Sequence, residues 1–436
     1  MPSSSTTVDR DVPIAIKSNN NARWPQRAVA FLLLGLAAVR AENTAIAASS
    51  DYEAPGLVET ATLVPESLLD VRQARVDPRA EADGWHVTYT LDGPEGVETL
   101  TGTEFLANRL REIRAIAALR KMNKSEEFGK ALLASGGEKL QSVASAVKDP
   151  VQTIQKLPKG ASKFFGRLGT TVKNAAEGKI GATDAAEAAL GVQRKRAELC
   201  LKLGVSPFTR DPVLRAELDT ASRAMAAGAT LMNVTGLIVG GGIGTAISVV
   251  NANQAFQRAL VESSPQELAA RNRQLLAKLG ASPESVDGFL GNPAFNPWQK
   301  SGVAATLSTI GLNPEPFLSR AADASSDEDA VYFIQMVRIL GQHQENKTPL
   351  AALLEMDGIP CALDQNGMLV VPVGSDLIRW TPALNARAGD FVEWSSDHAK
   401  IKGMVLATDG SVSERATGEL ARMGITVAPH ALGSPH

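Results

Sequence analysis

Residues 264–280 read SPQELAARNRQLLAKLG, and this stretch shows most directly what kind of fold the chain adopts. Ser264 is a typical N-terminal cap, Pro265 suits the first helical position, and Glu267 completes a capping box. Leucines follow at helical spacing, and Gly280 stands where a helix is expected to end. The stretch therefore predicts a helix whose two ends are both encoded locally.

The same start signal recurs along the chain. A capping residue precedes proline at Asp149-Pro150, Asp211-Pro212, Ser282-Pro283, Asn296-Pro297 and Thr348-Pro349. The cap oxygen accepts a hydrogen bond from a backbone N–H without a partner inside the helix, and proline has no N–H to leave unpaired there. Ser326, followed by the acidic residues 327–329, predicts one more helix start, because negative charge is favoured at a helix N-terminus. We therefore expect helices over most of residues 105–345.

The last 80 or so residues have a different pattern. Residues 359–363 and 368–373 are apolar runs that flank Asp364-Gln365-Asn366-Gly367. Asn-Gly between two such runs predicts a β-hairpin, and residues 377–380 can add a third strand.

A strand–helix–strand unit is expected after this hairpin. Residues 401–407 predict a strand, and Ser411 with Glu414 predicts a helix start. The helix is expected to end at Gly424, and residues 425–427 predict a second strand. Two strands joined by a helix in so few residues are expected to be parallel.

Residues 85–103 also predict a β-hairpin. Apolar residues alternate with polar ones from Trp85 to Leu91, residues 92–96 have turn composition, and residues 97–103 can return as the second strand. Residues 42–83 have no clear periodicity and are expected to be irregular, with a short helix near Pro65–Val71.

These patterns predict an α+β protein that is predominantly helical, with an N-terminal β-hairpin plus helix, a central helical body and a small C-terminal α/β domain. The expected divisions are a signal peptide with a polar leader (1–41), an irregular acidic segment (42–83), a hairpin with basic amphipathic helices (84–180), a helical body (181–348) and the small α/β domain (349–436).

Composition excludes several classes of protein. The chain has 44 basic and 47 acidic residues and a net charge of −3, which does not fit a nucleic-acid-binding protein. Two cysteines are too few for a disulfide scaffold or a cysteine-ligated zinc module. Cys200 and Cys361 both stand in apolar surroundings, so we expect two buried thiols, although export would permit a disulfide.

The N-terminus has the pattern of an export signal. Arg23 and Arg27 precede the uncharged run 28–39, which as a helix would rise about 18 Å and is too short to cross a bilayer. Small residues that allow cleavage after Ala41 or Ala47 follow. We expect a periplasmic or secreted protein; the alternatives are an uncleaved anchor and a buried helix.

Residues 139–176 lie in a basic block and are a candidate membrane-binding segment. Residues 109–179 carry 15 basic and 6 acidic residues, whereas residues 42–108 carry 3 and 13. Basic and aromatic side chains at helical spacing can lie on an anionic membrane surface. The alternative is a solvated helix face, or one paired with the acidic segment. The candidate membrane-surface residues are Lys156, Lys159, Lys163, Phe164, Phe165 and Arg167.

A second apolar segment has no charged residue from position 224 to position 257. Its core, residues 231–250, is long enough to span a bilayer as a helix. Gly236, Gly240 and Gly244 recur every four residues and would form a helix-packing or membrane face. The alternative, which we favour, is a buried or interfacial helical hairpin.

No pattern in the sequence identifies a catalytic or metal-binding site. The glycines at 240–244 lack the third glycine of a dinucleotide fingerprint and the Lys-Ser/Thr of a P-loop, so no cofactor is predicted. No histidine stands four residues from another, so no metal is predicted either. Asp397, His398 and Asp409 are the only candidates for a hydrolase-like site.

We therefore expect an exported cell-envelope protein with a binding or structural role. The sequence favours a protein that is not an enzyme. Its expected partners are a membrane surface or an apolar protein, and no nucleic acid; the sequence does not identify a small-molecule ligand. Two alternatives stay open: a hydrolase-like enzyme with its site in the C-terminal domain, and a soluble cytoplasmic helical protein.

Overall fold

The computed structural model describes residues 51–124, 128, 181–226 and 254–432, and it is an α+β protein that is mostly helical, as predicted. Its C-terminal sheet has the strand order β12-β10-β8-β7-β6. The strands are β6 (Leu350–Met356), β7 (Ile359–Asp364), β8 (Met368–Val373), β10 (Gly403–Thr408) and β12 (Ile425–Ala428). β6, β7 and β8 form an antiparallel meander, and β10 and β12 run parallel to β8.

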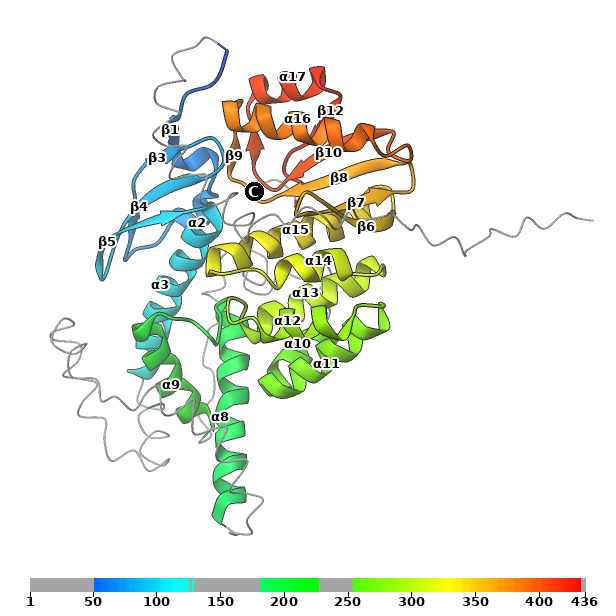
Figure 1. The fold of residues 1–436 in the computed structure, drawn as a ribbon. Helices are drawn as coiled ribbons and strands as arrows, with labels where there is room; N and C mark the ends of the chain where they lie inside the picture. Colours follow the sequence, from blue (N-terminus) through cyan, green and yellow to red (C-terminus); the bar gives the residue numbers. More distant parts are fainter. Residues whose placement is uncertain (1–50, 125–127, 129–180, 227–253, 433–436) are drawn as a thin grey trace, which may run out of the picture.

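Helices cover both faces of this sheet (Figure 1). One face carries α16 (Pro382–Ser396) and α17 (Glu414–Arg422), and the other carries α14 (Glu315–Ala321) and α15 (Asp327–Asn346). Every residue of β7 is buried, which fits a strand covered on both faces. Buried residues of the sheet and of these helices form one continuous core.

The predicted hairpin is confirmed at residues 359–373. Asp364 accepts hydrogen bonds on Oδ1 from the backbone N–H groups of Asn366 and Met368, each at 2.9 Å. Gly367 has φ +85°, a conformation that glycine adopts at little cost. The side chain of Asp364 and the permissive Gly367 therefore fix the turn.

The parallel strand–helix–strand unit is also confirmed, because β10 pairs with β12 across α17. The cap is Ser413, whose Oγ accepts from the Ala416 N–H at 3.0 Å, and not Ser411 as expected. Ser411 lies instead in the short strand β11 (Ser411–Val412), which pairs with β9 (Leu377–Ile378).

The N-terminal sheet contains more strands than expected. It is built from β1 (Gly56–Glu59), β2 (Arg75–Val76), β3 (Arg79–Ala82), β4 (Val87–Gly93) and β5 (Gly96–Thr101). β4 and β5 form the predicted hairpin. Residues 51–83 are not irregular, because Ala80 and Ala82 of β3 are buried and β3 pairs with both β1 and β4. The expected short helix is present as α2 (Glu66–Leu69).

The helical body connects the two sheets (Figure 1). Its helices are α3 (Thr103–Asn123), α8 (Gly181–Leu203), α9 (Pro212–Ala226), α10 (Gln254–Glu262), α11 (Pro265–Lys278), α12 (Pro283–Gly291) and α13 (Pro297–Ile310), followed by α14 and α15. The capping prolines open α9, α11, α12 and α13 as predicted. Thr348-Pro349 instead precedes β6, because the residues that follow pair with β7.

A buried carboxylate joins the N-terminal sheet to the C-terminal sheet. Asp376, which follows β8, accepts hydrogen bonds from the backbone N–H groups of Val87 and Thr103, each at 2.8 Å. The Asp376 N–H in turn donates to the Trp85 carbonyl at 2.9 Å. These bonds hold the start of β4 and the start of α3 against the end of β8.

Several predictions concern residues outside the described part of the chain: the signal peptide, the basic segment 139–176, and the apolar segment with Gly236, Gly240 and Gly244. In the part that the structure describes, no helix combines the length and apolar character needed to cross a bilayer. Cys200 and Cys361 are both buried, and neither is in a disulfide.

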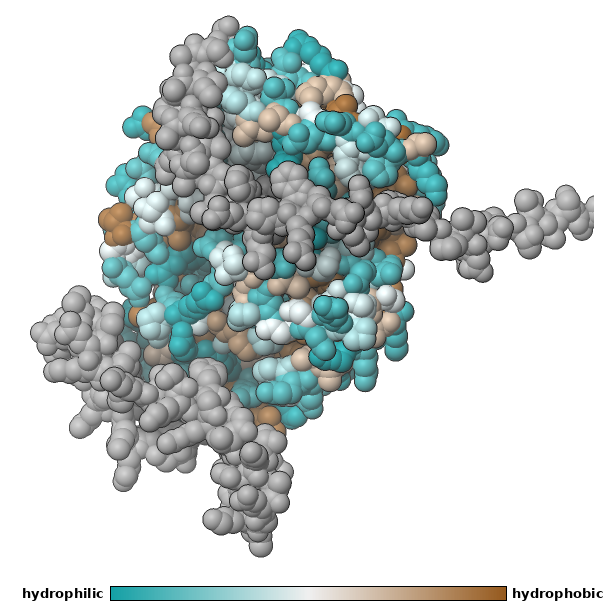
Figure 2. All heavy atoms as spheres, viewed as in Figure 1, coloured by the Kyte–Doolittle hydropathy of each residue, from teal (hydrophilic) through white to brown (hydrophobic). Residues whose placement is uncertain are grey.

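The visible surface is mainly hydrophilic, with hydrophobic residues scattered over it (Figure 2). The large hydrophobic side chains that are exposed in the described residues are Leu57, Val97 and Leu190, on β1, β5 and α8. Because they belong to three separate elements, they do not define an apolar docking face.

Candidate functional site

A cavity of about 470 Å³ lies where α3, α13, α15 and the loop 204–211 meet. A cavity of this size falls within the range of small-molecule sites. From α15 the side chains of Asp327, Val331, Ile334, Gln335 and Arg338 line it, at the three- and four-residue spacing of one helix face. From α3 the lining residues are Glu104, Phe105, Asn108, Arg109 and Glu112.

The loop 204–211 is held in place by local contacts. Gly204 has φ +68° and ends α8, and the Val205 N–H then bonds back to the Cys200 carbonyl at 3.0 Å. The ring of Phe208 packs edge-on against Trp298 of α13, with centroids 6.4 Å apart. Asp211 caps α9 by accepting from the Leu214 N–H at 2.7 Å. These contacts aim the polar residues of the loop at the cavity.

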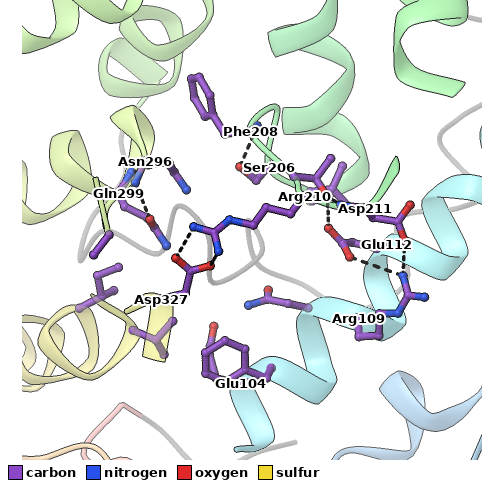
Figure 3. Close-up of a pocket in the computed structure, with 18 of the residues that line it drawn as sticks. Glu104, Arg109, Glu112, Ser206, Phe208, Arg210, Asp211, Asn296, Gln299 and Asp327 are labelled. Atoms are coloured by element: carbon purple, nitrogen blue, oxygen red, sulfur yellow. Dashed lines mark hydrogen bonds and ion pairs between the residues drawn. The ribbon is translucent and has the colours of Figure 1, made fainter. Parts of the chain in front are cut away.

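Arg109 organises one wall of the cavity (Figure 3). Its guanidinium bonds Asp211, donates from Nε to Glu98 at 2.6 Å, and lies 3.1 Å from Glu95. The exposed fraction of the side chain is only 12% for Arg109 and 6% for Asp211. Burial acts to lower the pKa of Arg109, but the bonds and charges of Glu98 and Asp211 outweigh it and raise that pKa.

Glu112 belongs to the same wall and accepts a hydrogen bond from the Thr209 hydroxyl. Burial raises the pKa of the Glu112 carboxyl, the bond from Thr209 opposes this shift, and the charge of Asp211 adds to it. The Arg109 guanidinium therefore pairs with several carboxylates, and the described part of this wall has no other basic side chain to bind a ligand.

A second ion pair crosses the cavity (Figure 3). Arg210 of the loop reaches Asp327 at the start of α15, with N–O distances of 2.7 and 2.6 Å. The side chain of Arg210 is 77% exposed and that of Asp327 is 37% exposed. Water screens such a pair, so it contributes little to the free energy of folding and can open at small cost.

Asp409, which follows β10, lies behind the cavity and holds one of its lining residues. The Gln335 amide donates to Asp409 Oδ2 at 2.9 Å, and the Ser375 N–H donates to Oδ1 at 3.2 Å. Burial raises the pKa of the Asp409 carboxyl to about 7; the Ser375 N–H acts against this, and the charge of Asp376 adds to it. Parallel strands commonly place functional residues at this end of a sheet.

The structure does not bring Asp409 together with Asp397 and His398, the other residues of the hydrolase-like hypothesis. His398 precedes β10 and Asp409 follows it, so the two lie at opposite ends of a strand about 20 Å long. The ring of His398 stacks on Trp394 at 3.9 Å, and its Nδ1 lies 2.7 Å from the Trp394 carbonyl oxygen. Asp397 is exposed at the end of α16. Only Asp409 is near the cavity.

No group of histidine, cysteine and acidic residues suited to a metal occurs in the described residues. The acidic residues 327–329 serve α15 instead: Asp329 completes a capping box with Ser326, and Asp327 pairs with Arg210. The cavity itself was not predicted from the sequence. The only relevant signal was Asp211-Pro212, which fixes where the loop 204–211 ends.

Comparison of this chain with known proteins gives no information on its function. No family model, curated protein or solved structure matches this chain.

Proposed function

We propose that this chain is a binding protein of the cell envelope that holds a small polar molecule in the cavity between α3, α13, α15 and the loop 204–211. The cavity carries the proposal: it is large enough for a small molecule, and charged residues from separate parts of the chain surround it. The expectation of export rests on the N-terminal sequence pattern.

The binding proposal is tested by filling the cavity. Ile334→Trp places an indole in the space that Ile334 lines, and Leu190→Trp makes the same change at a side chain that is 43% exposed on α8. We expect native mass spectrometry of the protein purified from its own envelope fraction to detect a small molecule on the wild type and on Leu190→Trp, but not on Ile334→Trp. Equal masses of bound material on all three, or none on any, would overturn the proposal.

Export is tested by cell fractionation with N-terminal sequencing of the mature chain. We expect an envelope or secreted location and a new N-terminus near Ala41 or Ala47. An intact Met1 in the cytoplasm would favour the alternative of a soluble cytoplasmic protein.

Membrane association is a separate proposal, which rests on sequence outside the described residues. Flotation of the mature protein with anionic vesicles at low and high salt tests it. Flotation that salt abolishes would support residues 139–176, because salt screens lysine and arginine. Flotation that resists salt would support residues 224–257. Failure to float in either condition would overturn it.

One observation favours the hydrolase-like alternative: the pKa of Asp409 is raised to about 7, which suits a group that gives and takes protons near neutral pH. Asp409 does not line the cavity itself, and it would be linked to a substrate there through Gln335, whose amide donates to it. If Asp409→Asn abolishes hydrolysis of a panel of nitrophenyl esters that the wild type cleaves, the alternative gains support; a wild type inert toward the panel would count against it.

A further inference from the structure

Most charged groups that line the cavity neutralise one another. Arg109 is bonded to Asp211 and lies 3.8 Å from Glu112, and Arg210 is paired with Asp327. A ligand that used any of these groups would have to break an existing ion pair. The charged lining residues that can bind a ligand without breaking an ion pair are therefore the remaining ones.

Two charged lining residues remain, and they have opposite sign. Glu104 stands in the first turn of α3, and Arg338 lies on α15. Neither makes a hydrogen bond or an ion pair with any residue that the structure describes, and both are half-buried. Such a charge can bond a complementary ligand without giving up a contact within the described part of the protein.

Glu104 and Arg338 both line the cavity and both lie within electrostatic reach of the same two groups. Both act electrostatically on the Asp409 carboxyl and on the guanidinium of Arg111. They do not contact each other, since no ion pair joins them within 4.0 Å. A molecule in this cavity that presents one cationic and one anionic group would therefore meet a complementary charge for each.

Apolar side chains continue the lining beyond these charges. Phe105 follows Glu104 on α3, and Val331 and Ile334 stand on the cavity face of α15. A ligand anchored at Glu104 and Arg338 would meet these side chains with the rest of its structure. An apolar substituent there would be removed from water and add to affinity.

We propose that the cavity binds a free α-amino acid with an apolar side chain, whose ammonium group bonds Glu104 and whose carboxylate bonds Arg338. This inference rests on the proposed binding function and adds the chemical class of the ligand. The Arg338 guanidinium can hold a carboxylate with two parallel hydrogen bonds, and Glu104 can accept bonds from the ammonium group.

Isothermal titration at pH 7 with three probes of one shape tests the proposal. L-Phenylalanine carries both charges, 3-phenylpropanoate only the carboxylate, and 2-phenylethylamine only the ammonium group. We expect L-phenylalanine to bind at least tenfold more tightly than either of the other two, because each would leave one protein charge unpaired.

Variants then assign each charge to its residue. Arg338→Gln should bind L-phenylalanine and 2-phenylethylamine equally, and Glu104→Gln should bind L-phenylalanine and 3-phenylpropanoate equally. Arg387→Gln is the matched control: Arg387 lies on α16, pairs with Asp390 at 3.5 Å, and does not line the cavity. It should bind all three probes as the wild type does.

Failure of this proposal is distinct from failure of the binding function. If L-phenylalanine binds no more tightly than the singly charged probes, or does not bind at all, the ligand class is wrong. If Ile334→Trp nevertheless lacks a small molecule that co-purifies with the wild type, the binding function stands and only the ligand class is wrong. If Arg338→Gln and Glu104→Gln each lose all three probes equally, the two residues do not recognise the charges and the assignment is wrong.

Discussion

Asp409 is a carboxyl whose ionisation opposes folding. Its pKa is raised to about 7 in the folded protein, against 3.8 for an unperturbed group, because burial disfavours the charged form. A carboxyl whose pKa is raised in the folded state makes its full contribution to the free energy of unfolding at low pH. That contribution is lost as pH rises from about 4 to about 7. The loss then stops, because the carboxyl is ionised in both states.

Asp409→Asn should remove this pH dependence. The carbonyl oxygen of the new asparagine can accept a hydrogen bond from the Ser375 N–H. The side-chain amide of Gln335 can flip, so that its oxygen accepts from the NH₂ group of the asparagine. Relative to the wild type, the variant should gain up to about 4 kcal/mol in the free energy of unfolding between pH 4 and pH 7. Urea unfolding at several pH values measures this, with exposed Asp397→Asn as control. A constant difference between variant and wild type would contradict the prediction.

Arg109 and Arg210 should differ sharply in their effect on stability. Arg109→Met leaves the buried Asp211 and its neighbouring carboxylates without a cation, so we expect a loss of about 3–5 kcal/mol. Arg210→Met removes an exposed pair and should cost less than about 1 kcal/mol. Chemical denaturation of the two variants compares them directly. Equal losses would show that the burial of Arg109 has no energetic consequence.

At the scale of single elements, Ser264 illustrates a locally encoded helix. Ser264→Ala removes the cap of α11 and the bond to the Glu267 N–H, which should cost about 1 kcal/mol. Ser263→Ala is the control, since the side chain of Ser263 does not cap the helix. Thermal unfolding of both variants measures the difference. A loss as large at Ser263 as at Ser264 would contradict the capping role.

Elements with local signals were predictable from the sequence, and elements defined by distant partners were not. Ser264 and Asn366-Gly367 encode a helix start and a turn through atoms only a few residues away. Residues 56–59 become a strand only because β3 lies beside them, and residues 350–356 only because β7 does. Strand formation depends on such pairing, which the sequence does not display locally.

The candidate site was less predictable than the fold for the same reason. Glu104 and Arg338 are 234 positions apart in the sequence and look like ordinary surface charges on their helices. Their lack of partners appears only when α3 and α15 are placed together around the cavity. His398 and Asp409 stood close together in the sequence, but β10 separates them.

At the scale of the whole molecule, Asp376 holds the two sheets together. Its pKa is lowered: burial opposes the shift, but the contact with His86 and the N–H groups of Thr103 and Val87 outweigh it. A carboxyl whose pKa is lowered in the folded state makes its full contribution to the free energy of unfolding above the pKa of the unfolded state, which is about 4. That contribution is lost as pH falls through the pKa of the folded state. Acid should therefore weaken the contact between the sheets.

Asp376→Asn should weaken the same contact at neutral pH. The amide has one acceptor oxygen and can satisfy Val87 or Thr103 but not both, so we expect a loss of about 2–3 kcal/mol. Hydrogen exchange should show faster exchange at the Val87 and Thr103 amides, while amides in α11 change less. The exposed Asp390→Asn is the control. Unchanged exchange at Val87 and Thr103 would refute the role of Asp376.

The position of Asp376 also governs when the protein can finish folding during its synthesis. Val87 precedes Asp376 by 289 residues, so the ribosome completes β4 and α3 long before the carboxylate that accepts their N–H groups exists. Glu53, which precedes β1, likewise bonds the Trp380 N–H and the Ser413 hydroxyl, which are synthesised much later. Native pairing at such long separation is slow to form. A nascent chain that is only half translated would therefore lack the hydrogen bonds that join its two sheets.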